Sequence, residues 1–278
     1  MPLNQTTLQC ARVSAGARQF DIEYQWLGAS NSHSPLVVFL HEGLGSVAMW
    51  RDFPSRFCTA LGCRGLVYSR PGYGASTPRP PEEKWGVDFM HLQAREVLPA
   101  LLRALNIDVT RDKPWLFGHS DGASIALIHA ASFPASVSAV IALAPHLFVE
   151  KISVDSIAKT LALYRTTDLK SKLARYHADV DSAFCGWNDI WLDPKFLQWN
   201  IEALLPSITC PALAIQGVDD EYGTMAQINR IKTALPHAQL LQLEQCGHSP
   251  HRDQPDAVIA AAREFLATVQ ADCTRYPL

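Results

Sequence analysis

The segment Gly118-His119-Ser120-Asp121-Gly122 constrains the fold of this chain more than any other feature. It follows the apolar run 114–117 and precedes the helix-like stretch 123–131. A Gly-x-Ser-x-Gly pattern between a strand and a helix places its serine on a sharp turn, where side chains two residues to either side would collide with neighbouring backbone. The following helix aims its free N–H groups at the same place. The pattern therefore predicts that Ser120 is a catalytic nucleophile.

The composition is that of a globular protein able to bury a sizeable core. The chain has 278 residues, enough for one large α/β domain with an insertion or for two small domains. Apolar residues make up 48% and charged residues 18%. Because the net charge is −3 and basic residues form no run, neither nucleic acid nor an anionic membrane is an expected partner.

The cysteines are odd in number, scattered and never spaced as C-x-x-C, which argues against a disulfide framework or a zinc site and suits a reducing cytoplasm. They are Cys10, Cys58, Cys63, Cys185, Cys210, Cys246 and Cys273. Residues 1–17 contain no apolar core of signal-peptide length, and no apolar run approaches the length of a membrane span. We therefore expect a cytoplasmic protein that binds no metal ion.

Strand-like and helix-like segments alternate along most of the chain. Residues 20–26 alternate apolar and polar side chains, as in a half-buried antiparallel strand, whereas residues 35–40 are continuously apolar, as in a buried parallel strand. Further strands are expected at 64–69, 115–117, 140–143, 212–215 and 240–243. Helices are expected at 48–61, 89–105, 123–133, 225–235 and 257–269. This order predicts an α/β fold: a mostly parallel, doubly wound sheet with helices on both faces.

The alternation is interrupted once, between residues 148 and 208. This stretch holds the helix-like pieces 156–164 and 169–176 and the aromatic-rich piece 184–192, but no convincing strand. We interpret it as a helical cap inserted into a core made of residues 1–147 and 209–278. A separate second domain is not favoured, because about 60 residues are marginal for independent folding.

Two further segments follow late strands and carry the residue types that a serine nucleophile needs. Residues 216–221 contain Asp219, Asp220 and Glu221, which are either an orienting carboxylate with its neighbours or a solvated acidic turn. Residues 245–250 contain His248 behind a glycine, where it can reach over the nucleophile. The chain order serine, acid, histidine, each at the carboxyl end of a strand, is that of a catalytic triad on an open α/β sheet.

A glycine-rich loop at residues 41–46 follows the buried strand 35–40. An acyl-transfer enzyme must stabilise an oxyanion, and such a loop can turn a backbone N–H towards the site. The donor would be Gly43 or Leu44, together with the N–H of Asp121. An ordinary strand-to-helix turn would also favour glycine here.

With these residues in place, the chain resembles the α/β-hydrolase family over nearly its whole length, including the turn 70–76, Arg-Pro-Gly-Tyr-Gly-Ala-Ser. In that family the triad acid usually lies three residues after the glycine at the strand end, which from Gly217 selects Asp220. Many members have His-Gly where this chain has His41-Glu42. This departure leaves open which backbone N–H binds the oxyanion. It also places the carboxylate of Glu42 near the oxyanion site, where it needs a partner or a rotamer that points away.

The Ser120-Asp121-Gly122 triplet resembles the valacyclovir-hydrolase (biphenyl-hydrolase-like) branch of serine esterases. That resemblance implies that Asp121 can recognise the amino group of an amino-acid ester. Alternatively, an aspartate in the first turn stabilises the helix dipole by roughly 0.3–1 kcal/mol. Trp187 and Trp191, four residues apart, share a helix face and either line a substrate pocket or pack the cap against the core.

The sequence thus predicts a serine hydrolase that cleaves a small-molecule carboxylic ester with Ser120, His248 and Asp220, without a cofactor, as a monomer or homodimer. A C–C bond hydrolase of ring-cleavage products uses the same triad and is the alternative. A non-catalytic small-molecule receptor on the same fold is a further one, which the complete set of triad residues disfavours.

Overall fold

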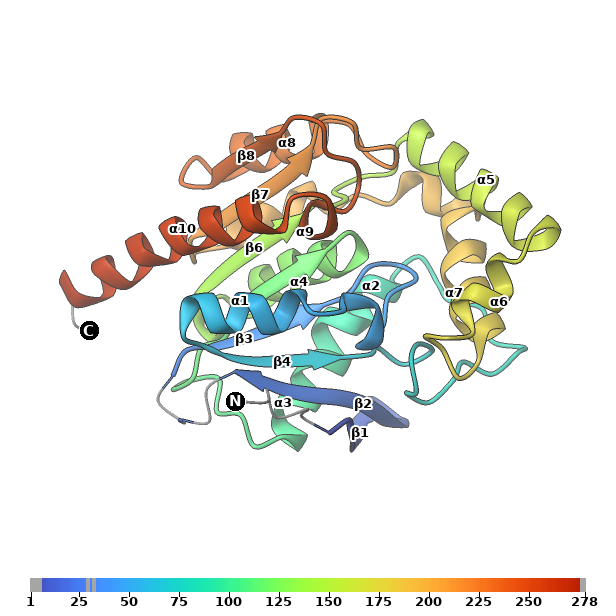
Figure 1. Ribbon diagram of the computed structural model, residues 1–278, viewed down its shortest axis with the longest axis horizontal. Coiled ribbons are helices and arrows are strands. Elements are labelled where there is room, and N and C mark those ends of the chain that lie inside the picture. The colour runs from blue at the N-terminus through green and yellow to red at the C-terminus, as the bar shows by residue number, and fades with distance from the viewer. Residues whose placement is uncertain (1–6, 29–30, 32–33, 276–278) are drawn as a thin grey trace.

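The computed structural model describes residues 7–28, 31 and 34–275, with the side chains of residues 270–275 excepted. Within this part of the chain, eight strands form one sheet in the order β1-β2-β4-β3-β5-β6-β7-β8 (Figure 1). The strands are β1 (Gln9–Ala15), β2 (Arg18–Gly28), β3 (Leu36–Leu40), β4 (Arg64–Tyr68), β5 (Trp115–His119), β6 (Ala139–Leu143), β7 (Ala212–Gly217) and β8 (Gln239–Leu243).

The sheet is parallel from β4 to β8 and antiparallel only at β1 and β2. The central strands β3, β5, β6 and β7 are buried along their whole length, which explains their continuous apolar runs. The predicted mostly parallel α/β sheet is confirmed. Strand β1 was not predicted, because it is an edge strand of mainly small and polar residues, and only Ala11, Val13 and Ala15 are buried.

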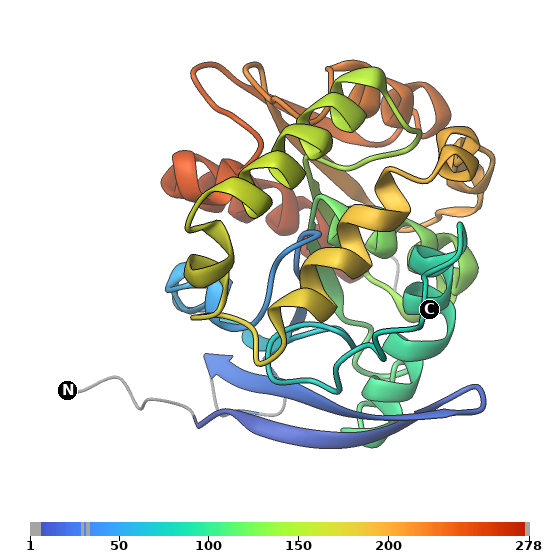
Figure 2. The same ribbon diagram turned by 90° about the vertical axis from the view of Figure 1, so that its right-hand side faces the viewer.

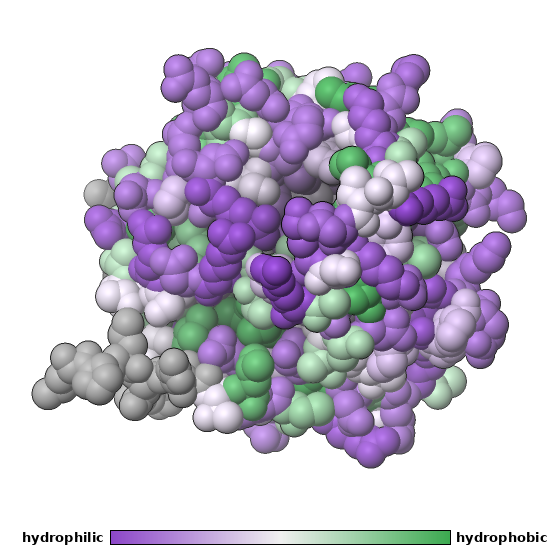
Figure 3. Space-filling view, turned by 45° about the vertical axis from the view of Figure 1, so that its right-hand side comes forward, coloured by the Kyte–Doolittle hydropathy of each residue, from purple (hydrophilic) through white to green (hydrophobic). Residues whose placement is uncertain are grey.

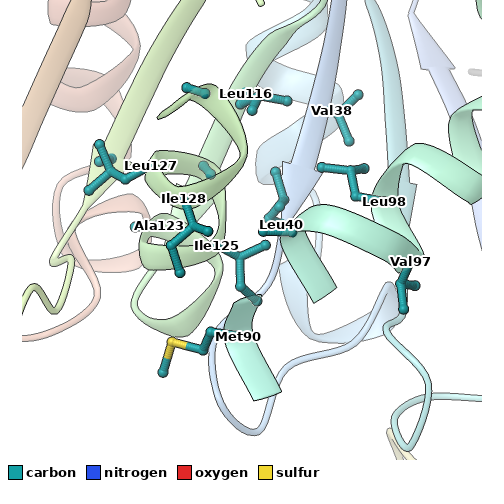
Figure 4. Close-up of a cluster of buried hydrophobic side chains, with 14 of the residues drawn as sticks. Val38, Leu40, Met90, Val97, Leu98, Leu116, Ala123, Ile125, Leu127 and Ile128 are labelled. Carbon is teal, nitrogen blue, oxygen red and sulfur yellow. The ribbon is translucent and has the colours of Figure 1, made fainter. Parts of the chain in front are cut away.

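Helices cover both faces of the sheet (Figure 1). They are α1 (Phe53–Leu61), α2 (Phe89–Leu92), α3 (Leu98–Ala104), α4 (Asp121–Ser132), α5 (Lys151–Thr166), α6 (Leu169–Leu173), α7 (Val180–Trp191), α8 (Ala226–Ala234), α9 (Pro250–Asp253) and α10 (Pro255–Arg275). Alternate side chains of β3 pack on opposite faces: Val37 and Phe39 lie with α1 and α10, and Val38 and Leu40 with α4 (Figure 4).

Two predicted helices are interrupted. The helix expected at 48–61 is a 3₁₀ turn, Ala48–Trp50, followed by α1, because Arg51 between them has a positive φ of 55°. The helix expected at 89–105 contains a π-turn, Gln93–Val97, between α2 and α3. Pro99 has no N–H to continue the regular ladder there. The ring of His129 on α4 instead donates to the freed carbonyl of Ala94 over 2.7 Å.

The residues between β6 and β7 form α5, α6, α7 and two 3₁₀ helices, Pro194–Gln198 and Glu202–Ser207. In Figure 2, helices α5 and α7 both lie in front of the sheet, on the side where the parallel strands end. One isolated antiparallel bridge, between Phe148 and Asn200, joins the two ends of this α5–α7 segment.

Hydrophilic residues dominate the face seen in Figure 3, where the hydrophobic areas are small and separate.

The six cysteines whose side chains are described are unbridged, and Cys273 lies outside the described side chains. Among the described residues, no helix combines the length and apolar character needed to cross a membrane. No signal peptide is expected in residues 1–17. Of these, residues 1–6 lie outside the described residues.

Candidate active site

Ser120 lies between β5 and α4 in a backbone conformation that few non-glycine residues adopt, with φ 53° and ψ −122°. The flanking glycines make this turn possible. A Cβ at Gly118 would collide with backbone of Gly122 and Ala123, and a Cβ at Gly122 would collide with the Leu40 carbonyl on β3. The strand, turn and helix therefore pack too closely for any other residue at these two positions.

Ser120, His248 and Asp220 form one hydrogen-bonded chain. The Ser120 Oγ lies 2.9 Å from Nε2 of His248, and Nδ1 of His248 lies 2.8 Å from Oδ1 of Asp220. Because a carboxylate only accepts, Nδ1 carries a proton and Nε2 faces the serine hydroxyl as the acceptor. The backbone N–H groups of Tyr222 and Gly223 also donate to Oδ1 of Asp220, which fixes the carboxylate.

The electrostatics of the pair suit a general base. Burial by itself lowers the pKa of His248, but the hydrogen bond to Asp220 and its negative charge outweigh burial and raise that pKa above its ordinary value. Burial by itself raises the pKa of Asp220, but the hydrogen bond from His248 holds it below the ordinary value. Asp220 is thus ionised and His248 is the more basic for it.

The two other acids of the 216–221 segment lie elsewhere. Asp219 is exposed, whereas Oε2 of Glu221 accepts a hydrogen bond of 3.2 Å from the backbone N–H of His248. The structure therefore brings Asp220, rather than Asp219 or Glu221, to the imidazole ring. Glu221 instead holds the main chain of the histidine.

The loop 41–46 is fixed through its carbonyl groups. The Glu42 carbonyl accepts from the Arg70 guanidinium (2.8 Å), from Nδ1 of His41 (2.7 Å) and from the Gly45 N–H (3.0 Å). In a trans peptide the N–H of the next residue points opposite to that carbonyl, so these bonds also fix the direction of the Gly43 N–H. Within the described part of the chain, nothing accepts from the N–H of Gly43, Leu44 or Asp121.

Asp121 is buried, and protein groups face both of its carboxylate oxygens. Nε1 of Trp191 on α7 donates to Oδ1 over 3.1 Å, and the guanidinium of the buried Arg70 lies 3.9 Å from Oδ2. Burial raises the pKa of Asp121 to about 6, although the charge of Arg70 opposes this shift. Arg70 belongs to the turn 70–76, where the sequence pattern gave it no individual role.

A cavity of about 180 Å³ opens beside Ser120, and both tryptophans line it. Trp187 and Trp191 are buried as well, so they contribute to the packing of α7 and to the cavity wall together. Five further residues with ionisable side chains line the same cavity without having been predicted as site residues: Glu42, His119, His146, Tyr222 and Arg252. His146 packs edge-on against Trp191, and its burial, together with the charge of His248, lowers its pKa to about 3.

His119 could have been suspected from its place beside Ser120 in the motif. His146 and Arg252, by contrast, lie in segments without a recognisable pattern. Among the described residues, no group of three or more histidine, cysteine, aspartate or glutamate side chains is arranged to hold a metal ion.

Residues 37–262 match the sequence model of the alpha/beta hydrolase family, and with the sheet order and the site geometry this shows that the chain belongs to that family. It is an enzyme of the hydrolase class. The expected resemblance to the valacyclovir-hydrolase branch is confirmed at low identity. The chain is 28% identical over 206 residues to the human (Homo sapiens) serine hydrolase BPHL, covering 72% of this chain and 68% of that protein.

A second relative is 2-hydroxy-6-oxononadienedioate/2-hydroxy-6-oxononatrienedioate hydrolase 1 of Dechloromonas aromatica (strain RCB). It is 24% identical over 287 residues, covering 94% of this chain and 95% of that protein. Among solved structures, a carboxylesterase of Nitrososphaera gargenis superposes with a TM-score of 0.74 at 21% identity. That superposition covers 94% of this chain and 99% of the other. At this identity, the structural likeness shows the shared fold.

Proposed function

We propose that this protein is a serine hydrolase that cleaves a small, uncharged carboxylic ester through an acyl-enzyme. The observation that carries the proposal is the continuous chain from Ser120 Oγ through His248 to Asp220, with distances of 2.9 and 2.8 Å. Nucleophile, base and orienting acid are thus all within hydrogen-bond reach, as covalent acyl transfer requires.

In the first step Ser120 attacks the ester carbonyl while Nε2 of His248 takes the hydroxyl proton. Asp220 holds the imidazole in the required tautomer and stabilises its positive charge. The tetrahedral oxyanion is bound by the N–H of Asp121 and by a second N–H from the loop 41–46. We assign that second donor to Gly43 rather than Leu44, because the hydrogen bonds to the Glu42 carbonyl fix the Gly43 peptide in advance.

The intermediate collapses when the bond to the alcohol oxygen breaks and His248 gives its proton to the leaving alcohol. Water then attacks the acyl-enzyme and loses a proton to His248. When the bond between the acyl carbon and Ser120 Oγ breaks, His248 returns this proton to Oγ and the carboxylic acid is released. Every proton transfer in this cycle uses groups of this chain, and the sequence-based expectation that no cofactor takes part is kept in the proposal.

The cavity favours a small and neutral substrate. Its volume of about 180 Å³ is below the roughly 300–1,000 Å³ of pockets for drug-sized ligands. Its wall is largely apolar, with Leu44, Met49, Ile157, Trp187 and Trp191 contributing. The charged groups are already engaged, since Glu42 pairs with Arg252 over 3.1 Å and Asp121 faces Arg70.

We further propose that residues 148–208 act as a cap over the site. Helix α7 contributes Trp187 and Trp191 to the cavity wall, and α5 contributes Ile157. The substrate must therefore enter between this segment and the ends of the strands, so the cap would set the size of the ester that can bind.

Cleavage of a carbon–carbon bond is the second candidate, because the Dechloromonas aromatica relative is by its name a hydrolase of a dioate and aligns with 94% of this chain. A dicarboxylate needs cationic groups in its pocket. Of the arginines and lysines in the described part of the chain, Arg252 alone lines the cavity, and Glu42 pairs with it. The neutral ester is therefore the first choice.

The two candidates are separated by one substrate panel. We expect measurable hydrolysis of p-nitrophenyl acetate and butyrate, a fall in kcat/KM for the octanoate, and at least about 100-fold less activity on a vinylogous diketo acid. Preferred turnover of the diketo acid would replace the ester proposal with carbon–carbon cleavage. Tight binding of esters without any turnover would contradict both.

A further inference from the structure

Glu42 stands where many members of the family have the glycine of a His-Gly pair. Its carboxylate is partly buried and is directed at His119. Its side chain is only 14% exposed, and Oε2 lies 3.6 Å from Nδ1 of His119, an ion-pair distance. Gly45 leaves the room for this carboxylate, since a Cβ there would lie 2.5 Å from Oε2. Burial by itself raises the pKa of Glu42, but the interaction with His119 holds it well below the ordinary value, so Glu42 is ionised.

The opposite side of the His119 ring reaches the main chain of His248. Nε2 of His119 lies 2.7 Å from the His248 carbonyl oxygen. Because a carbonyl only accepts, Nε2 carries the proton and donates. Both ring nitrogens of His119 thus face oxygen atoms, Nδ1 that of Glu42 at 3.6 Å and Nε2 that of the His248 carbonyl at 2.7 Å. The ring is 1% exposed and also packs against His248 and His251, with centroid distances of 5.1 and 4.7 Å.

The main chain of His248 is therefore held at both ends. Its N–H donates to Glu221 over 3.2 Å, and its carbonyl accepts from His119. Helix α9, which follows His248, is joined to the loop 41–46 and to the 3₁₀ turn after it by Arg252, which donates to Oε1 of Glu42 and to the Met49 carbonyl. Glu42 thus contacts both His119, which precedes Ser120, and Arg252, which follows His248.

We propose that Glu42 and His119 form a second carboxylate–imidazole pair, which positions the catalytic histidine through its backbone carbonyl. Glu42 orients the ring of His119, His119 fixes the His248 carbonyl, and the imidazole of His248 stays 2.9 Å from Ser120 Oγ. This inference rests on the proposed catalytic roles of Ser120 and His248. Glu42 and His119 are positioning residues in it, and neither exchanges a proton with substrate.

The test is a double-mutant cycle on kcat for p-nitrophenyl butyrate. His119→Phe keeps a ring but removes the donor, and we expect kcat to fall about 30-fold with KM within about threefold of wild type. His119→Gln keeps an N–H that can reach the carbonyl, and we expect it to recover most of kcat. Glu42→Gln is expected to lower kcat about 10-fold. The matched control is Asp256→Asn, which removes an exposed carboxylate paired with Arg56 and should leave kcat unchanged.

Because Glu42 acts through His119, the double variant Glu42→Gln/His119→Phe should be no slower than His119→Phe alone. Multiplication of the two losses would overturn the proposal, and so would a loss confined to KM, which would mean that Glu42 contacts substrate. If His119→Phe does not fold, the same cycle is run with His119→Gln, where Glu42→Gln should cost less than about twofold.

A second readout does not depend on activity. The proton that Nδ1 of His248 donates to Asp220 should give a downfield ¹H NMR signal. We expect this signal to shift or broaden in Glu42→Gln and His119→Phe but not in Asp256→Asn. An unchanged signal in folded Glu42→Gln would contradict the positioning role. If wild type lacks esterase activity, the proposed function fails, whereas active wild type with indifferent Glu42 and His119 variants refutes only this inference.

Discussion

The indole Nε1–H of Trp191 donates to Oδ1 of Asp121 over 3.1 Å, although the two residues are 70 positions apart in the chain. Trp191 is the last residue of α7, and Asp121 follows Ser120 as the first residue of α4. This bond joins the helical segment between β6 and β7 directly to the turn that presents Ser120. It also occupies one of the two oxygens with which Asp121 could bind a substrate amine.

Loss of this bond should destabilise the protein by about 1–3 kcal/mol, because a buried carboxylate oxygen would be left without a donor. We expect Trp191→Phe to lower the free energy of unfolding by that amount. Trp199→Phe is the matched control, since Trp199 is also buried but its Nε1 has no partner among the described residues. Equal destabilisation in urea titrations of the two variants would show that the hydrogen bond contributes nothing.

Asp121→Asn should slow amino-acid esters and simple esters by the same factor, within about threefold. The reason is that Trp191 and Arg70 already face the carboxylate, so the charge of Asp121 is balanced inside the protein. The measurement is kcat/KM for valine and isovaleric acid esters of the same alcohol. A loss of more than about tenfold for the valine ester alone would instead establish amine recognition by Asp121.

The acid limb of the pH profile of kcat/KM reports the pKa of His248 in the free enzyme, because the ring must be uncharged to take the Ser120 proton. The bond to Asp220 outweighs burial and raises that pKa. Asp220→Asn should therefore move the limb to lower pH and reduce kcat by roughly 10⁴-fold. Asp219→Asn, at an exposed neighbour, should do neither; a limb that stays in place in Asp220→Asn would refute the assignment.

Gly122→Ala should destabilise the fold by at least about 3 kcal/mol, because the new methyl group would meet the carbonyl groups of Leu40 and His41 in rigid backbone. Gly62→Ala provides the comparison. Gly62 has φ 65°, and no atom lies within 4 Å of the place that its added methyl group would take, so only the backbone conformation costs energy, about 1 kcal/mol. Thermal unfolding that ranks the two variants equally would contradict the close packing at Gly122.

The sheet could be predicted because its central strands are buried on both faces and so must be continuously apolar, as 35–40 and 140–143 are. The place of Ser120 could be predicted because backbone packing leaves no alternative to glycine at 118 and 122. Both patterns can be recognised in a short stretch of sequence, although the atoms that exclude a side chain at Gly122 belong to Leu40 and His41, far away in the chain.

The contacts that surround Ser120, Asp220 and His248 could not be predicted, because they join distant parts of the chain and their residues form no recognisable pattern. Glu42 and Arg252 are 210 positions apart, and His119 and the His248 carbonyl 129. Strand β1 was missed because its small and polar residues make a weak strand pattern. The break at Arg51 depends on a positive φ that nothing in the residue type indicates.

The central claim is that Ser120 is the acyl-accepting nucleophile. The most direct measurement compares wild type with Ser120→Ala in the hydrolysis of p-nitrophenyl butyrate, with unfolding curves to show that both are folded. We predict a loss of about 10⁴-fold or more in kcat and a covalent phosphonate adduct on wild type only. Full activity of folded Ser120→Ala, or labelling that persists in it, would contradict the claim.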